Sequence, residues 1–286
     1  MKRKTNGPTF DFPVVDAHIH IYPDSLAPKV INSRLEQKER LHPEFQDILP
    51  ALDGTISCCR NSMAISGISI SVNLPVATCP NHVEHTNEVW RAYAKPNDGI
   101  VSLAALHPAT PDAPDVVAKI AATGFSGIKF HPDYQQFNFN DPSMDDIWAA
   151  MAEHELTAYL HTGRDYVFAP PFRSSPSEVR KLHRRFPNLK IVAAHLGGFG
   201  MWNETEEVLV GEDVTLDLSH SFFWMPHEQI ARIIRNHTAR RIIFGSDAPW
   251  QDPTLILNAF VQLPLTENER RTICYENAKE LFNLKM

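Results

Sequence analysis

Eight short apolar runs, separated by amphipathic stretches, recur along almost the whole of this 286-residue chain. The runs have the length and β-branched content of buried strands, and the stretches between them have the spacing of helices. Strands that alternate with helices imply parallel pairing and right-handed crossovers. The expected strands cover residues 13–20, 65–74, 100–106, 126–131, 156–161, 189–195, 214–219 and 241–247.

The fold class follows from this alternation. Closing eight parallel strands leaves no unpaired edge, so the sequence predicts an α/β fold, a (β/α)8 TIM barrel. An open doubly wound sheet would usually carry a glycine-rich turn after an early strand, whereas here the first strand ends in histidine. The expected helices cover residues 82–93, 114–122, 143–153, 177–186, 227–236, 253–260, 267–274 and 276–282.

Two additions extend this barrel. A long insertion follows the first strand at residues 21–65, and extra helices follow the eighth strand. The insertion is expected either to join an interface or to act as a lid over the site. Barrels often reach about 250 residues as one unit, so a single domain over residues 1–286 is the simplest prediction.

Charge and composition exclude several classes of partner. The net charge is −7 and the sequence contains no basic stripe, so we expect no nucleic-acid partner. No run of 18 apolar residues and no apolar leader is present, so we expect neither a membrane span nor secretion. The four cysteines lack the spacing of a zinc ribbon or a disulfide framework, which favours a cytoplasmic location. A homo-oligomer is left open.

Histidines and one aspartate stand where expected strands end. His18 and His20 are two residues apart, so in a strand their side chains point to the same face. His161, His195 and Asp247 end three further strands. Barrel enzymes place their active sites at this end of the barrel.

These residue types suit a divalent metal. Imidazole and carboxylate ligands fit zinc, iron or manganese, and three histidines with one aspartate leave room for a water. Taken singly, a histidine here can be a core residue, and Asp247 can cap a helix ahead of Pro249. Four strands ending in potential ligands favour one catalytic metal ion, with Zn2+ expected first and Mn2+ or Fe2+ as alternatives.

Several motifs resemble the amidohydrolase superfamily, in particular its family 2 branch of hydrolases, lactonases and decarboxylases such as aminocarboxymuconate semialdehyde decarboxylase. The similarity runs from about residue 13 to the end of the chain and is specific for fold and metal site rather than for substrate. The motifs are VVDAHIHIYP (14–23), LHTG (160–163), AAHLGG (193–198), FGSDAPW (244–250) and ENAKELF (276–282).

This resemblance implies roles for the strand-end residues. The metal ligands would be His18, His20, His161 and Asp247. His195 would hydrogen-bond the metal-bound water or substrate, or complete the metal shell. Many members of the superfamily bridge two metals with a carboxylated lysine on the fourth strand.

Lys129 lies in that fourth strand, so the two-metal arrangement is open. One metal is favoured, because the family 2 branch generally uses one. Lys129 and His131 are then expected to be substrate-pocket residues on one face, or strand-end polar residues without a chemical role.

The expected chemistry uses the residues beside the metal. Asp247 would serve as general base and then general acid, and His195 would stabilise charge on the attacked oxygen. Asp16 is expected on the face of His18 and His20 but deeper in the barrel. There it would orient a ligand imidazole from behind, or be an inert interior carboxylate.

Two arginines and a group of aromatic residues are further candidates for substrate binding. Arg164 and Arg173 could capture a substrate carboxylate, although both could lie on a solvated loop. The aromatic residues could wall an apolar or aromatic pocket, or pack beneath the loops; they are Trp202, Phe222, Phe223, Trp224 and Trp250.

Three functions remain in competition. The first is hydrolysis of an ester, lactone or amide of a small, carboxylate-bearing substrate by metal-activated water. The second is non-oxidative decarboxylation of an unsaturated or aromatic acid. The third is a non-catalytic barrel that binds a metal or a small molecule, which the intact ligand set and the acid–base candidate Asp247 disfavour.

Overall fold

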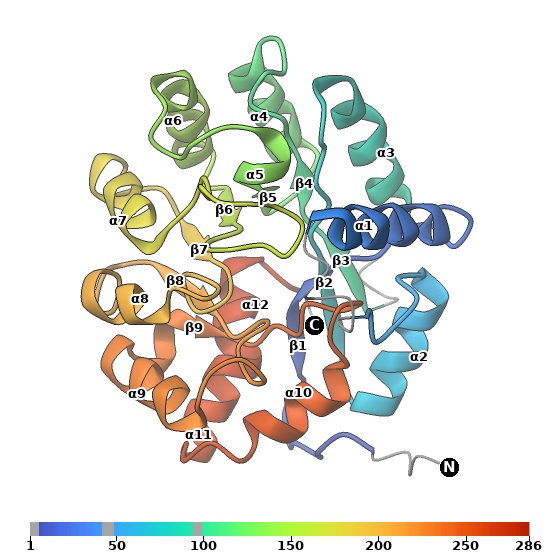
Figure 1. Ribbon diagram of the computed structural model, residues 1–286, viewed down its shortest axis with the longest axis vertical. Coiled ribbons are helices and arrows are strands. Elements are labelled where there is room, and N and C mark those ends of the chain that lie inside the picture. Colours follow the sequence, from blue (N-terminus) through green and yellow to red (C-terminus); the bar gives the residue numbers. More distant parts are fainter. Residues whose placement is uncertain (1–5, 42–48, 94–98, 286) are drawn as a thin grey trace.

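The computed structural model describes residues 6–41, 49–93 and 99–285, so residues 42–48 of the insertion lie outside the described part. Parallel strands alternate with helices, and the helices surround the strands (Figure 1). The strands are β1 (Val15–Ile19), β2 (Ile70–Asn73), β3 (Ile100–Ser102), β4 (Ala104–Ala105), β5 (Gly127–Phe130), β6 (Thr157–Leu160), β7 (Ile191–Ala193), β8 (Thr215–Asp217) and β9 (Ile242–Ile243).

Hydrogen bonding joins these strands into a barrel. The ladders follow the chain order, as β1-β2-β3 and as β4-β5-β6-β7-β8-β9, and every pairing is parallel. Leu103 separates β3 from β4, and its amide donates to the Asn73 carbonyl, so the two short strands form one expected strand. Between β9 and β1, the Ala17 amide donates to the Phe244 carbonyl and the His20 amide donates to the Ala248 carbonyl.

The helices occupy most of the expected positions. They are α1 (Ala27–Leu41), α2 (Ile56–Ser66), α3 (Val83–Tyr93), α4 (Ala113–Ala122), α5 (Pro132–Gln135), α6 (Asp145–Glu153), α7 (Pro176–Arg185), α8 (Trp202–Val208), α9 (His227–His237), α10 (Pro253–Phe260), α11 (Glu267–Arg271) and α12 (Asn277–Leu281), with a π-helical turn at Thr272–Glu276 between the last two. None of the described helices has the length and apolar character needed to cross a membrane.

One expected strand began too early, and one helix was missed. The second strand was expected over residues 65–74, but α2 extends to Ser66 and the strand begins only at Ile70. Gly67, in the left-handed region at φ 79°, ends the helix, because its amide donates to the Met63 carbonyl. Helix α8 was not expected, because ETEEV follows Trp202 and Asn203 without an apolar period.

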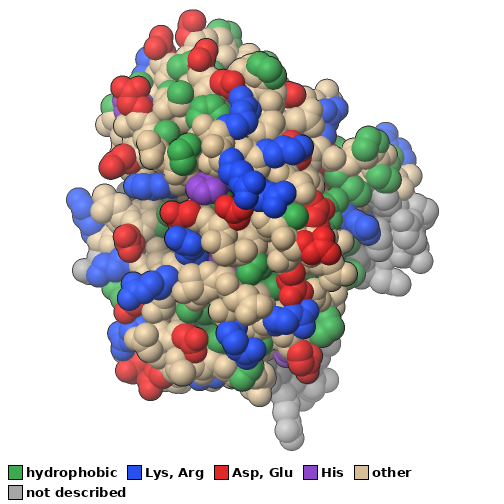
Figure 2. Space-filling view, turned by 90° about the vertical axis from the view of Figure 1, so that its left-hand side faces the viewer, with side chains coloured by type: hydrophobic (Ala, Val, Ile, Leu, Met, Phe, Trp, Pro, Cys, Tyr) green, Lys and Arg blue, Asp and Glu red, His purple; other side chains and the backbone are tan. Residues whose placement is uncertain are grey.

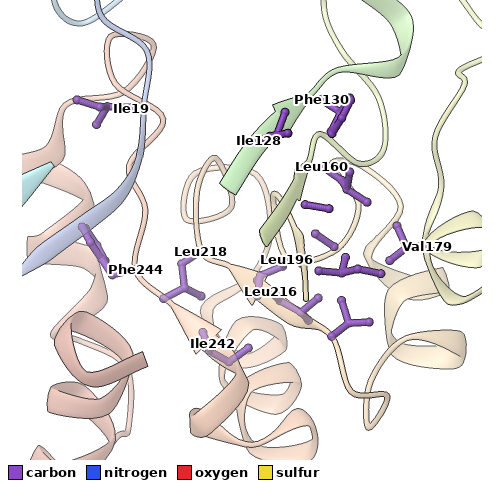
Figure 3. Packing of buried hydrophobic residues seen from close by; sticks show 14 of the residues in the cluster. Ile19, Ile128, Phe130, Leu160, Val179, Leu196, Leu216, Leu218, Ile242 and Phe244 are labelled. Atoms are coloured by element: carbon purple, nitrogen blue, oxygen red, sulfur yellow. The ribbon is translucent and has the colours of Figure 1, made fainter. Parts of the chain in front are cut away.

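Strand residues alternate between two apolar layers. In β6, Ala158 and Leu160 pack towards the helices, whereas Tyr159 joins a separate cluster inside the barrel. Figure 3 shows the outer layer, in which Leu160 lies near Val179 of α7. Phe282, just beyond α12, stacks on Tyr159 with ring centroids 6.2 Å apart, so the C-terminal segment packs against the barrel interior.

The insertion reaches the barrel end where the strands finish. Figure 1 shows α1 in front of the strands, near β3. The Arg34 guanidinium of α1 lies 4.1 Å from the ring centroid of Tyr134 in α5, which directly follows β5. A cation over an aromatic face is attractive, so this contact fixes α1 beside the candidate site.

The helical surface carries charges of both signs. Figure 2 shows Lys and Arg side chains interspersed with Asp and Glu on one face. Arg185 pairs with Asp145 at 2.6 Å, and Arg232 pairs with Glu206 at 2.6 Å. Exposed pairs of this kind contribute little individually, so burial inside the barrel accounts for most of the stability.

Truncating a fully buried aromatic residue should test that core. Trp148 is completely buried, and its indole donates to the Phe139 carbonyl at 2.9 Å. Trp148→Ala should lower the free energy of unfolding by about 3–5 kcal/mol, measured by urea denaturation. Tyr93→Ala, at a half-exposed aromatic on α3, is the control and should cost less than about 1 kcal/mol. Equal losses in the two variants would contradict this placement of the core.

Candidate metal centre

The end of β1 directs two histidines to one point. His18 Nε2 and His20 Nε2 lie 3.1 Å apart, and both side chains are largely buried. Gly245 allows His18 to sit there, because a Cβ on Gly245 would lie only 2.8 Å from the His18 Cβ. The expectation that these two side chains share one face therefore holds in the structure.

Asp247 meets this pair from the segment after β9. Its carboxylate Oδ1 lies 3.4 Å from His18 Nε2 and 3.5 Å from His20 Nε2. The Asp247 amide donates to the His18 carbonyl at 2.8 Å, and its φ of 65° falls in the left-handed region. Non-glycine residues rarely adopt that backbone, and those that do are concentrated at functional sites.

The far nitrogens of His18 and His20 show which ring atoms face inward. His18 Nδ1 lies 2.7 Å from the Asp217 carboxylate, and His20 Nδ1 lies 2.9 Å from the Leu74 carbonyl. Carboxylates and carbonyls only accept hydrogen bonds, so both Nδ1 atoms carry the hydrogen. The two facing Nε2 atoms therefore carry no hydrogen, and each presents a lone pair.

His195 and His161 form a second facing pair by the same logic. The Ser219 hydroxyl donates to Asp217, so the Ser219 oxygen accepts from His195 Nδ1 at 2.8 Å. His161 Nε2 donates to the Arg164 carbonyl at 3.1 Å. His195 Nε2 and His161 Nδ1 then both carry a lone pair instead of a hydrogen, and the two atoms lie 3.1 Å apart.

These lone pairs and one carboxylate fit a cation. Two ligand atoms held about 2.1 Å from a tetrahedral ion stand roughly 3.4 Å apart, close to the 3.1–3.5 Å separations among His18, His20 and Asp247. Facing lone pairs repel each other unless a positive charge lies between them. His161 is not in this three-residue cluster and approaches it through His195, whose ring centroid lies 5.2 Å from that of His18.

Burial keeps the imidazoles neutral. It lowers the pKa of His18 and of His20 to about 4, with the Lys129 ammonium adding to the effect, and lowers the pKa of His195 to about 3. Burial would raise the pKa of Asp247, but its neighbours His18, His220 and His195 together outweigh this and hold the pKa well below its usual range. At neutral pH the set is thus in the form that binds metal, with neutral imidazoles and an ionised carboxylate.

Asp217, which the sequence did not single out, has the orienting role expected of Asp16. Its carboxylate accepts from His18 Nδ1, from the Tyr159 hydroxyl at 2.6 Å and from the His195 amide at 2.9 Å. Asp217 ends β8, in the same position as the other site residues, so a search of strand ends for every carboxylate would have found it.

The prediction for Asp16 was wrong. Its carboxylate accepts from the Ser246 amide and hydroxyl rather than from an imidazole. The register of β1 shifts between Asp16 and Ile19, so simple alternation no longer puts Asp16 and His18 on one face. Burial raises the pKa of Asp16 to about 7.

Lys129 and His131 share the inner face of β5, as expected. Lys129 Nζ lies 3.5 Å from His18 Nε2, and burial lowers the lysine pKa to about 8. The His131 ring stacks on His161 with centroids 3.9 Å apart, and its Nε2 lies 3.0 Å from the Asp165 carboxylate. Both side chains therefore border the histidine cluster.

The other expected substrate residues lie farther out. Arg164 and Arg173 are exposed on the loop after β6, where the Arg173 amide donates to Asp133. Trp202 is half-buried, and its indole donates to the His195 carbonyl at 3.0 Å. Trp202 thus contacts the backbone of a site histidine, whereas both arginines are exposed to solvent.

His220 was also missed by sequence reasoning. It directly follows the seventh expected strand, and its Nδ1 lies 3.0 Å from Asp247 Oδ2. A histidine one residue beyond a strand end carries the same signal as His161, but the expected boundary at Ser219 excluded it.

A parallel barrel with a histidine–aspartate cluster at its strand ends defines the class of metal-dependent barrel enzymes. Residues 15–284 match the family model described as Amidohydrolase. The chain belongs to the amidohydrolase family, as the motifs predicted, and is a metal-dependent enzyme of that superfamily. No curated protein sequence matches the chain significantly.

Solved structures share this fold at low sequence identity. The 5-carboxyvanillate decarboxylase from Sphingomonas paucimobilis is 14% identical, with a TM-score of 0.71, over 96% of this chain and 99% of that chain. The 2,6-dihydroxybenzoate decarboxylase from Rhizobium is 18% identical, with a TM-score of 0.71, over 95% and 99%. A 5-carboxyvanillate decarboxylase from Novosphingobium aromaticivorans, complexed with manganese and 4-hydroxy-3-methoxy-5-nitrobenzoic acid, is 12% identical, with a TM-score of 0.72, over 99% and 100%.

Removing the Asp217 carboxylate should weaken metal binding. Asp217→Asn removes the group that orients His18, so the affinity for Mn2+ or Zn2+ should fall about 10- to 100-fold in a chelator competition assay. Asp16→Asn is the comparison, because Asp16 is equally buried but accepts from Ser246 and from the His18 amide rather than from the His18 ring. The metal affinity should fall less in Asp16→Asn than in Asp217→Asn. An equal fall in both variants would show that the loss of any buried carboxylate weakens metal binding.

The metal-free protein should lose stability as the pH falls. The pKa values of His18 and His20 drop from 6.5 to about 4 on folding, so the unfolded chain binds protons that the folded chain does not. The free energy of unfolding should therefore be retained above pH 6.5 and decline towards pH 4. Urea denaturation across this range should show a shallower decline in a His18→Gln/His20→Gln variant, and the same slope in both proteins would contradict the assignment.

Proposed function

We propose that the protein is a metal-dependent, non-oxidative decarboxylase of aromatic carboxylic acids. The observation that carries this proposal is the position of the His18, His20 and Asp247 cluster next to a wall of aromatic side chains. Support also comes from the structural likeness to decarboxylases of 5-carboxyvanillate and 2,6-dihydroxybenzoate.

The aromatic wall consists of Tyr166, Phe199 and Trp224. The ring centroid of Tyr166 lies 5.1 Å from that of Phe199 and 5.4 Å from that of Trp224. His220 touches all three rings and reaches Asp247 at 3.0 Å. Trp224 is 40% exposed, so the wall is accessible at the mouth of the barrel, and flat apolar surfaces of this kind suit an aromatic ring.

The proposed metal ligands are His18, His20, His161 and Asp247, and a divalent ion held there would supply a Lewis acid for substrate oxygens. We propose one ion per chain. The histidine-rich donor set suits zinc, and the manganese in the Novosphingobium aromaticivorans structure supports manganese as the alternative. With Lys129 unmodified, its ammonium beside His18 would favour an anionic substrate group.

The proposed reaction breaks the bond between the ring carbon and the carboxyl carbon. Carbon dioxide leaves, the electron pair stays on the ring carbon, and that carbon takes up a proton. We assign this proton transfer to Asp247, whose ionised carboxylate would first take a proton from water and then pass it to the ring carbon. His195 would hold the reacting group by a hydrogen bond. The neutral His195 Nε2 accepts a hydrogen bond in the inferred tautomer, which suits a substrate hydroxyl.

Hydrolysis, which the sequence ranked first, is the second candidate. The low pKa of Asp247 favours it, because an ionised carboxylate at neutral pH is suited to accept a proton from an attacking water. Arg164 and Arg173 as carboxylate-binding residues stay predictions under either reaction. The cytoplasmic location and the homo-oligomer also stay predictions.

A product assay separates the two reactions. Protein loaded with Mn2+ or Zn2+ is incubated with 2,6-dihydroxybenzoate, 5-carboxyvanillate and simple benzoates, and carbon dioxide release is measured. Parallel incubations with aryl esters and lactones measure acid release. Decarboxylation predicts carbon dioxide from at least one acid, and Asp247→Asn should lower its turnover about 10²- to 10⁴-fold.

Asp252→Asn provides the control for that variant. Asp252 caps α10 by accepting from the Thr254 amide, and asparagine caps helices equally well. Its turnover should match the wild type. Ester or lactone cleavage without carbon dioxide from any acid would overturn the decarboxylase proposal and leave the hydrolase.

A further inference from the structure

His220 occupies a strained and enclosed position at the end of β8. It is 6% exposed, and its φ of 55° lies in the left-handed region. Such a backbone is unfavourable for a residue with a Cβ and persists only where the surroundings impose it. His195 and Asp247, which belong to the same site, also have this left-handed backbone.

One edge of the His220 ring faces the free oxygen of Asp247. Asp247 Oδ1 is directed at His18 and His20, whereas Oδ2 lies 3.0 Å from His220 Nδ1. A lone pair on that nitrogen would repel the carboxylate, so Nδ1 carries the hydrogen. The two oxygens of Asp247 thus have different neighbours. The approach of His220 Nδ1 to Oδ2 is at ion-pair distance but lacks hydrogen-bond geometry, so its influence on the carboxylate is electrostatic.

The other edge of the ring is held by Tyr166. Its hydroxyl lies 3.2 Å from His220 Nε2, which is the lone-pair nitrogen in this tautomer, so Tyr166 donates. Trp224 stacks on the ring at an interplanar angle of 14°, and Phe199 meets it edge-on with centroids 5.1 Å apart. Rotation of the imidazole away from Asp247 is therefore blocked on three sides.

We propose that His220 is a positioning residue that fixes Asp247 as a one-oxygen metal ligand, with Tyr166 holding His220 in the required tautomer. His220 belongs to none of the groups of converging ligand atoms among the described residues, which argues against a role as a further ligand. The inference rests on Asp247 as a metal ligand and not on whether the reaction is decarboxylation or hydrolysis.

Cobalt substitution tests this role without any substrate. The visible absorption bands of Co2+ report the number and geometry of its ligands, so they change if Asp247 rotates or binds through both oxygens. His220→Leu should bind one Co2+ per chain with altered bands and with an affinity about 10- to 100-fold lower. His220→Asn keeps an N–H donor near the position of Nδ1 and should restore most of the wild-type spectrum.

Two further variants complete the comparison. Tyr166→Phe should shift the bands in the same direction as His220→Leu, but less. His227→Asn, at a half-buried histidine outside the cluster, should leave the spectrum unchanged. Thermal melting of each metal-free variant separates loss of folding from loss of positioning.

Three results would overturn the proposal. These are a wild-type Co2+ spectrum in His220→Leu, no rescue by His220→Asn when both variants are folded, and an equal change in His227→Asn. A failure of every acid to release carbon dioxide would sink the decarboxylase assignment alone, because the cobalt spectra would still report how Asp247 is held.

Discussion

The buried carboxylate of Asp217 connects the barrel to its candidate centre. It accepts hydrogen bonds from the side chains of His18 and Tyr159 and from the His195 amide, which belong to β1, β6 and the end of β7. Burial alone would raise the pKa of Asp217, but the neighbouring His18 and His195 and the hydrogen bonds from His18 and Ser219 lower it below the ordinary value. One ionised group therefore sets the orientation and the tautomer of the imidazoles around it.

This arrangement has an energetic cost. Burying ionised and neutral polar groups together is unfavourable unless each has a partner, and removing one partner leaves the other exposed to the full cost of its desolvation. Here the outer hydrogen bonds are satisfied, whereas the inner lone pairs of His18, His20, His161 and His195 face each other at 3.1 Å in two pairs. A cation is the species that resolves this repulsion, so binding it should also stabilise the fold.

The sequence predicted what depends on strand ends and failed where backbone geometry intervenes. The barrel was confirmed, and the convergence of His18, His20 and Asp247 follows because parallel strands end together. Asp16 was misplaced because a register shift in β1 leaves no trace in the residue pattern. His220 escaped notice because its left-handed backbone returns a side chain to the site from just beyond the strand.

Chemistry beyond the ligands was less predictable still. Arg164 and Arg173 were chosen for their charge, yet both are exposed, whereas Tyr166, Phe199 and Trp224 meet only because loops after different strands pack together. Loop packing depends on contacts between residues far apart in sequence, which no local pattern records. The metal ligands could thus be proposed from the sequence, as could Trp224 as a pocket residue, whereas Tyr166 and Phe199 were identified only from the fold.

Elemental analysis of the purified protein, beside His18→Ala and Asp247→Ala, tests the metal centre most directly. About one zinc or manganese ion per wild-type chain is expected, with most of it lost in each variant while circular dichroism shows that both remain folded. Two ions per chain would instead indicate a bridging Lys129. Wild-type protein that contains no metal when prepared without chelators, and takes up none on titration, would contradict the metal centre altogether.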